Sequence, residues 1–181
     1  TKLNKAPVEK GWTRWCYEKR PYADNEFRGR NAGVTGGSAN RLIIIDIDNH
    51  ECFSQYLADN MLDMPETLVV KSGGKSLHHY YMLPDGDFHS RTVREGKVNV
   101  FDVIANGRQV LAPGSIHPIT GGLYTIRDNL PIAPAPAWLL DLARKSDPHE
   151  TAKKGAEHVA RMASMPNLEQ VPQVDVLTLP I

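Results

Sequence analysis

The chain has few cysteines and no long apolar run. Only Cys16 and Cys52 occur among its 181 residues, and neither belongs to a Cys-x-x-Cys pair. A zinc ribbon therefore has no ligand set, and we expect no zinc site. No apolar stretch reaches the length that crosses a bilayer, and we see no signal peptide. We therefore expect a cytoplasmic protein that has no membrane partner and whose cysteines stay reduced.

The chain also lacks net charge. Lys and Arg number 21, as do Asp and Glu, so the formal net charge is zero and the sequence pI is about 7.0. This balance gives no global signature of a nucleic-acid binder. Basic residues do gather locally, because the stretch from Arg14 to Arg41 holds six basic residues against three acidic ones. A local basic groove and a solvated surface are both compatible with that surplus.

A nucleotide-binding loop of the Walker type is missing as well. The letters GGKS (Gly73–Ser76) invite that interpretation, but the motif needs a glycine at position 69, which is Val69. The residues that follow also have the pattern of a strand. We therefore expect a glycine turn leading into a strand in which Ser76 and His78 share one face. Both can donate hydrogen bonds to phosphate, although a histidine in such a place can also be purely structural.

The pattern of apolar and turn residues predicts an α+β fold. Asn49 is the expected N-cap of the first helix, and Asn106-Gly107 predicts a hairpin between the two strands around it. The sheet should be mixed or antiparallel. Residues 1–146 should form one domain, and residues 147–181 a peripheral helix followed by a linker or tail. The strands are expected at 41–48, 67–72, 77–83, 97–105, 108–113 and 121–126, and the helices at 51–61 and 136–145.

Three carboxylates occupy positions where a strand normally carries apolar residues. Asp46 and Asp48 end the run RLIIIDID and, two residues apart, should point to the same side. Two like charges so close repel each other, and a divalent cation would relieve that repulsion. The alternative is a solvated strand end. Asp102 lies within the strand VNVFDVIA, where its alternative role is a salt bridge to Arg108.

A loop after these strands carries two more polar candidates. Ser115 and His117 lie in APGSIHPITGGLY, where they could hold phosphate or a template strand. The alternative is a turn stiffened by its prolines.

The order of these motifs resembles the primase-polymerase (Prim-Pol) domain of the archaeo-eukaryotic primase superfamily. The matching residues are IDID with Asp46 and Asp48, SLH from Ser76 to His78, and Asp102 in FDVIANG. The flanking stretches NAGVTG, LAPGSIHPITGGLY and PAPAWLLDL are also similar. The resemblance covers about Gly11 to Arg144, which places the catalytic domain within residues 1–146.

The resemblance implies a fold and a set of roles. We expect an RRM-like sheet with flanking helices, and a two-metal site for Mg²⁺ or Mn²⁺ at Asp46, Asp48 and Asp102. His78, aided by Ser76, would contact the phosphates of the incoming nucleotide. From chemistry and placement alone, we add four further phosphate-binding candidates: Lys75, Arg108, Ser115 and His117.

The implied activity is that of a template-dependent nucleotidyltransferase. It would make or extend primers on single-stranded DNA, with a primer and (d)NTPs as the other substrates and a helicase as a fused or separate partner. The family often has Glu where this chain has Asp48, whose shorter side chain would shift the metal. Without a zinc module, primer extension is better supported than priming de novo. A fragment of a larger replicase is one interpretation of a sequence that begins with Thr1, and the sequence leaves this question open.

Two other functions are compatible with the same residues. One is a non-catalytic, RRM-like module for single-stranded nucleic acid, in which Trp15 and Tyr80 would stack on bases. The other is a metal-dependent replication-initiator nuclease. In that enzyme His117 would have to join His78, because His78 and His79 are adjacent and face opposite sides of a strand.

Overall fold

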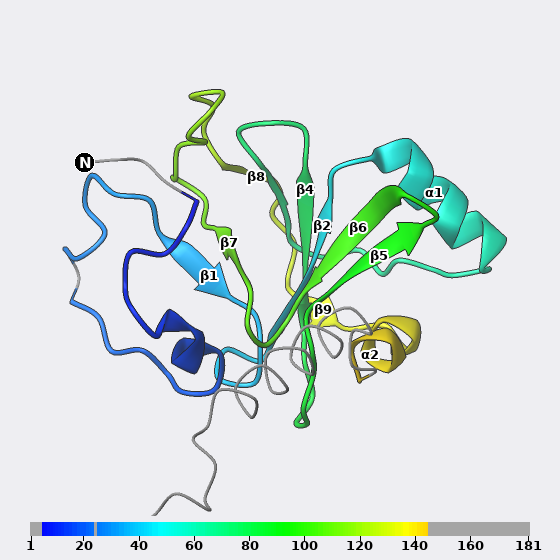
Figure 1. Cartoon of the computed structure of the whole chain (residues 1–181), viewed down its shortest axis with the longest axis horizontal. Coiled ribbons are helices and arrows are strands. Elements are labelled where there is room, and N and C mark those ends of the chain that lie inside the picture. Colours follow the sequence, from blue (N-terminus) through cyan, green and yellow to red (C-terminus); the bar gives the residue numbers. More distant parts are fainter. Residues whose placement is uncertain (1–4, 24, 145–181) are drawn as a thin grey trace, which may run out of the picture. The chain divides into compact units, whose positions relative to one another are not determined.

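The fold is known from a computed structural model, which describes residues 5–23 and 25–144. The helix and tail predicted at 147–181 lie outside these residues. Within them no helix is long and apolar enough to cross a membrane. The elements are η1 (Trp12–Cys16), β1 (Gly33–Thr35), β2 (Leu42–Ile47), α1 (His50–Asp59), β3 (Val69–Lys71), β4 (Leu77–Met82), β5 (Arg91–Glu95), β6 (Val98–Ile104), β7 (Gln109–Leu111), β8 (Thr125–Asp128), β9 (Ala133–Pro134) and α2 (Ala137–Arg144) (Figure 1).

One large sheet organises these elements. Its strands run in the order β5-β6-β2-β4-β3-β8, each antiparallel to its neighbours, and β9 pairs in parallel with β4. A separate two-stranded ribbon pairs β1 with β7. The predicted α+β class with a mostly antiparallel sheet is therefore confirmed, whereas its likeness to an RRM stays a prediction.

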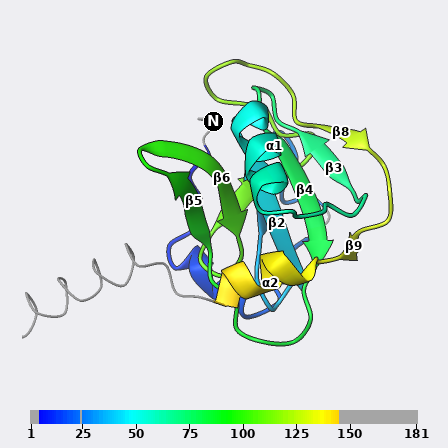
Figure 2. The ribbon, with the colours of Figure 1, turned by 90° about the vertical axis from the view of Figure 1, so that its right-hand side faces the viewer.

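The central strand β2 is buried on both faces because its side chains alternate between two cores. Ile43, Ile45 and Ile47 belong to a core that includes residues of α1 and α2, and Figure 2 shows both helices on the same side of the sheet. Ile44 belongs to a second core, together with residues of β7. Asn49 caps α1 as predicted, since its side chain accepts a hydrogen bond from the backbone N–H of Cys52.

The predicted hairpin around Asn106-Gly107 is wrong. The chain does turn there, with φ of 87° at Gly107, but β7 pairs with β1 and not with β6. The reason is that both edges of β6 are already taken, one by β2 and the other by β5. The strand β5 was not expected, because Val93 is the one strongly apolar residue in RTVRE.

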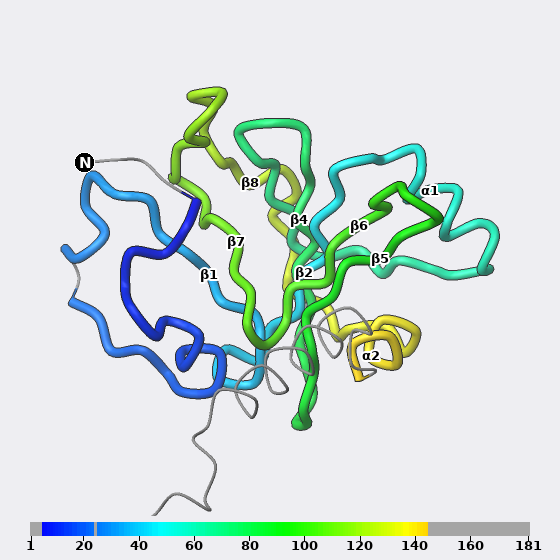
Figure 3. Tube along the Cα trace, in the orientation of Figure 1, coloured from blue at the N-terminus to red at the C-terminus, as the bar shows by residue number. Residues whose placement is uncertain are grey.

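The β1–β7 ribbon covers the sheet face opposite the helices. Val110 and Leu111 of β7 pack with Ile44, Tyr80 and Ile104 of the large sheet. The tube in Figure 3 shows the N-terminal segment running along this ribbon. The ribbon and the loops next to it therefore form one wall beside the face that carries the predicted carboxylates.

Candidate active site

Four polar side chains lie side by side across four strands. Asp46 on β2 is the direct partner of His78 on β4 and of Asp102 on β6. Asp102 is in turn the partner of Thr92 on β5. Neighbouring strands lie about 5 Å apart, so these side chains form a continuous row. Two residues further along, Ile44, Tyr80 and Ile104 belong to the second core.

Asp46 and His78 meet in the most enclosed part of the row. His78 is only 3% exposed, and its Nε2 lies 3.3 Å from Oδ1 of Asp46. Neither Asp46 Oδ1 nor His78 Nδ1 has a hydrogen-bond partner within the described chain, although both atoms are buried. Buried polar atoms without a partner are costly, and they mark places where function takes precedence over stability.

Asp102 is held by an arginine. Nη1 of Arg108 donates to Oδ1 of Asp102 at 2.8 Å and to the hydroxyl of Thr92 at 3.2 Å, and Thr92 also donates to Asp102. The salt bridge considered from the sequence is thus present. About a third of the Arg108 side chain is exposed, so the guanidinium remains within reach of an anion from solvent.

Asp48 lies one residue beyond β2 and accepts a hydrogen bond from the hydroxyl of Ser76. Ser76 is in turn part of a tight turn, because Oγ of Ser72 accepts from the backbone N–H groups of Gly74 and Ser76. The Lys75 side chain is exposed at the tip of this turn, while its carbonyl accepts from Nε2 of His50. The Asp48–Ser76 contact thus continues the site beyond the ends of β2 and β4.

His117 and Tyr124 extend the site from the loop that follows β7. The Tyr124 ring stacks on His117 with centroids 6.1 Å apart and lies 5.8 Å from the ring of His78. Burial raises the pKa of Tyr124 to about 12, and the nearby Asp46 and Asp48 add to that rise. The Tyr124 hydroxyl therefore lies in the field of the carboxylates. Sequence reasoning missed Thr92, which belongs to no recognisable motif, and it gave Tyr124, the last residue of LAPGSIHPITGGLY, no role.

His117 is fixed as the neutral tautomer that carries its proton on Nε2. Its Nδ1 accepts hydrogen bonds from the backbone N–H groups of Ile119 and Thr120. Partial burial and the nearby Lys5 both lower its pKa. Nε2–H is therefore a neutral donor, which can bind a phosphate oxygen without a change of charge. Ser115, by contrast, is buried and uses its hydroxyl to bind both backbone groups of Ala32.

Two loops of the site touch through their glycines. A Cβ on Gly73 would lie 2.1 Å from the carbonyl oxygen of Gly122, and a Cβ on Gly122 would lie 2.2 Å from that of Gly73. The Thr120 hydroxyl donates to the Gly73 carbonyl across the same contact. The turn that carries Ser76 and the loop that carries His117 are thus held together by backbone contact that any side chain would break.

A Gly73→Ala variant is therefore expected to lower the melting temperature. Overpacking of this kind costs about 1–3 kcal/mol, which corresponds to roughly 2–10 °C for a chain of this size. Gly74→Ala is the matched control, because its Cβ would meet nothing closer than 3.6 Å. Thermal unfolding of both variants by circular dichroism measures the difference. Equal melting temperatures would contradict the close contact.

The carboxylates suit a divalent cation in kind but are engaged by protein donors. Their oxygens are the hard ligands that Mg²⁺ and Mn²⁺ prefer, and buried Asp46 Oδ1 has no hydrogen-bond partner in the described chain. Arg108 and Ser76, however, occupy oxygens of Asp102 and Asp48. Across residues 5–23 and 25–144, no three His, Cys, Asp or Glu side chains are grouped as a ready metal site.

The chain matches a known protein family. Residues 2–138 match the family described as "Bifunctional DNA primase/polymerase, N-terminal". The matched range contains the whole row, the Ser72–Ser76 turn and the loop with His117 and Tyr124. A search of curated proteins found no match.

Proposed function

Because the chain belongs to the bifunctional DNA primase/polymerase family, we propose that it is a template-dependent nucleotidyltransferase. It makes or extends primers on single-stranded DNA and releases pyrophosphate. The observation that carries this proposal is the register of β2: Asp46 stands directly between Asp102 and His78. Carboxylates next to donors for phosphate are what transfer of a nucleotidyl group requires.

Each side chain of the site has a role in this proposal. Asp46, Asp48 and Asp102 hold Mg²⁺ or Mn²⁺, which when bound would activate the primer hydroxyl and neutralise the triphosphate. When the cations bind, Arg108 and Ser76 release the carboxylate oxygens of Asp102 and Asp48. They then donate hydrogen bonds to the phosphates instead. His78 and His117, whose rings both lie next to Tyr124, donate to the phosphates, and Lys75 adds charge from the tip of its turn.

The direct test is incorporation of labelled nucleotides on single-stranded DNA, with and without an annealed primer, in Mg²⁺ and in Mn²⁺. Extension of the primed template is expected, and it should stop when a chelator removes the cations. Products without a primer would add priming to the activity. Absence of any product, together with DNA binding that needs no metal, would refute the proposal and favour a binding module.

Both alternatives are less well supported. The binding module relied on Trp15 and Tyr80. Tyr80 is only 4% exposed and packs in the second core, so its assignment to base stacking is wrong, whereas that of Trp15, which is half-buried, stays a prediction. The nuclease needed His78 and His117 on one metal ion, but Nδ1 of His117 accepts from two backbone N–H groups, which leaves the ring proton on Nε2 and no lone pair for a metal. Both histidine rings instead contact Tyr124.

A further inference from the structure

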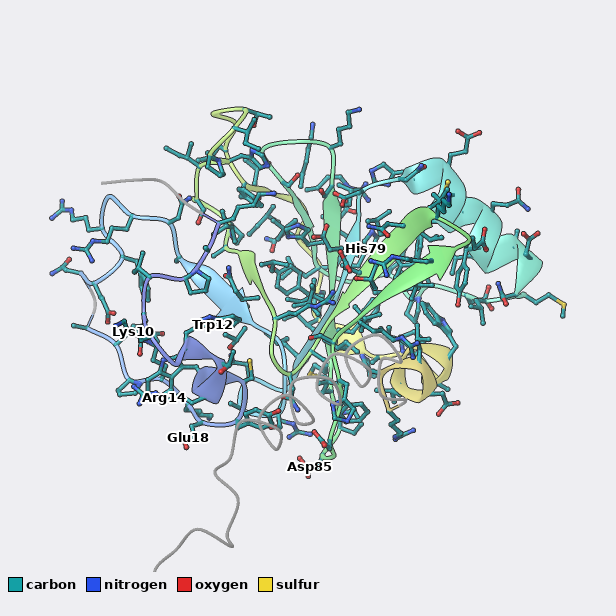
Figure 4. All side chains as sticks on the ribbon, viewed as in Figure 1. Lys10, Trp12, Arg14, Glu18, His79 and Asp85 are labelled. Carbon is teal, nitrogen blue, oxygen red and sulfur yellow. The ribbon has the colours of Figure 1, made fainter. Side chains whose placement is uncertain are left out.

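A hollow lies apart from the row of Asp46, His78, Asp102 and Thr92, between the N-terminal segment and the β1–β7 ribbon. Its volume is about 1030 Å³, which is at the upper end for sites that bind small molecules or single nucleotides. In Figure 4, Lys10, Trp12 and Arg14 lie along this segment, on the side of β1 away from the large sheet. None of the residues in the row lines it.

Aromatic side chains line this N-terminal cavity, and some of them are exposed. Trp12, Trp15, Tyr22 and Phe27 all contribute to its walls. Tyr22 is 69% exposed and Phe27 39% exposed, and their rings lie 5.9 Å apart. Exposed aromatic rings at the mouth of a cavity offer faces on which flat, apolar groups can stack.

Ion pairs hold the walls in place. Arg20 donates to Glu9 and to Glu26, at 3.0 Å in each case, and its guanidinium lies over the rings of Trp15 and Phe27. The Trp15 indole N–H also donates to Glu9. These contacts lower the pKa of both glutamates, for Glu9 chiefly through Trp15 and for Glu26 chiefly through Arg20. The carboxylates of Glu9 and Glu26, which both line the cavity, are therefore already bound to other residues of its wall.

The surrounding segment is basic although the whole chain is neutral. From Lys5 to Arg30 the sequence has seven Lys and Arg residues against four Asp and Glu residues. Lys5 and Arg30 line the cavity themselves. Positive charge combined with aromatic faces suits a nucleic-acid strand, which has both phosphates and flat bases. An apolar protein surface has no groups that would pair with the positive charge.

The cavity shares a wall with the candidate active site. Asn31, which lines it, exchanges two hydrogen bonds of 2.8 Å with the backbone of Ile116, the residue before His117. Ala32, also in the lining, binds Ser115. This accounts for the buried Ser115: it ties the loop of the active site to the wall of the cavity.

From these contacts we propose that the N-terminal cavity binds single-stranded nucleic acid by stacking its bases on Tyr22 and Phe27. The choice of single-stranded nucleic acid as the ligand rests on the proposed function, because a polymerase must hold a template strand beside its active site. The strand then passes over the 112–124 loop toward His117. Lys5 and Arg30 attract its phosphates, while Arg20 keeps the aromatic wall in shape.

The test measures binding of a labelled single-stranded oligodeoxynucleotide to the full chain by fluorescence anisotropy, in a chelator so that metals do not contribute. Tyr22→Ala/Phe27→Ala should weaken binding by about tenfold or more, since stacking one base on an aromatic side chain is worth that much. Tyr17→Ala is the control, because Tyr17 is 59% exposed in the same segment but is not part of the lining. Duplex DNA should be affected less than single strands.

Incorporation assays separate this inference from the proposed function. If the double variant raises the KM for template but leaves kcat unchanged, the cavity holds the template. If the double variant binds the oligodeoxynucleotide as tightly as the native chain does, the inference about the cavity is wrong. Incorporation of nucleotides by the native protein would not change that conclusion. If the native chain binds the oligodeoxynucleotide through Tyr22 and Phe27 but incorporates no nucleotides, the inference about the cavity is supported and the proposed function is wrong.

Discussion

An Asp46→Asn variant is expected to lose nucleotide incorporation by roughly 10³-fold or more. Stabilisation of charge by bound metal is worth several kcal/mol, and each 1.36 kcal/mol is a factor of ten in rate. Asp46 is at the centre of the row, so its loss affects the contacts of both Asp102 and His78. Single-turnover incorporation on a primed template, in Mg²⁺ and in Mn²⁺, measures the effect.

The same variant should remain folded and become no less stable. Asp46 and Asp102 are directly opposed like charges, and such pairs cost roughly 0.2–1 kcal/mol. Removing one charge should leave the melting temperature unchanged or raise it by up to about 4 °C. Asp128→Asn is the control, since Asp128 binds Arg127 on β8 at the other end of the sheet. Normal incorporation by a folded Asp46→Asn variant would show that this carboxylate is not catalytic.

Arg108→Gln should raise the KM for nucleotide by about tenfold. A hydrogen bond from a charged group is worth roughly 1.5–3 kcal/mol, and Arg108 is a partly exposed cation that is bound to the row through Asp102. Steady-state incorporation at varied nucleotide concentration gives KM and kcat separately. Arg108→Lys should recover only part of the affinity, because a lysine cannot bind two oxygens in the planar geometry of a guanidinium.

The control for this prediction is the matched pair at the far edge of the sheet. Arg127 also binds an aspartate, at the surface of β8, and Arg127→Gln should change neither constant. If Arg108 only supports Asp102, its loss would lower kcat and stability at an unchanged KM for nucleotide. That result would limit Arg108 to a structural role.

Much of this architecture could be predicted from local patterns. The run of isoleucines in β2 and the cap at Asn49 depend on neighbouring residues alone, and both occur where they were expected. The pairing of β7 could not be predicted in this way. It depends on which edges of β6 remain open, and the sequence around Asn106 and Gly107 does not encode that.

In the candidate site, too, relations within one strand or turn could be predicted, whereas contacts between strands and loops could not. Spacing within one strand or turn relates Asp46 to Asp48 and Ser76 to His78. The match of Asp46 with Asp102 depends on the register between β2 and β6, which no short motif specifies. Tyr124 enters the site only because Gly73 and Gly122 bring their two loops together, so its role is visible only in three dimensions.

The pairing of Gly33 with Leu111 has a consequence for how the protein folds. Most of the large sheet lies between these residues in the sequence, whereas β5 and β6 are joined by a single short turn. Closing a long loop is slow, so hairpins of this kind form first and the β1–β7 ribbon late. During refolding, secondary structure should therefore return before the N-terminal cavity and the nucleic-acid binding that we propose for it. A nascent chain can complete this site only after β7 has been synthesised.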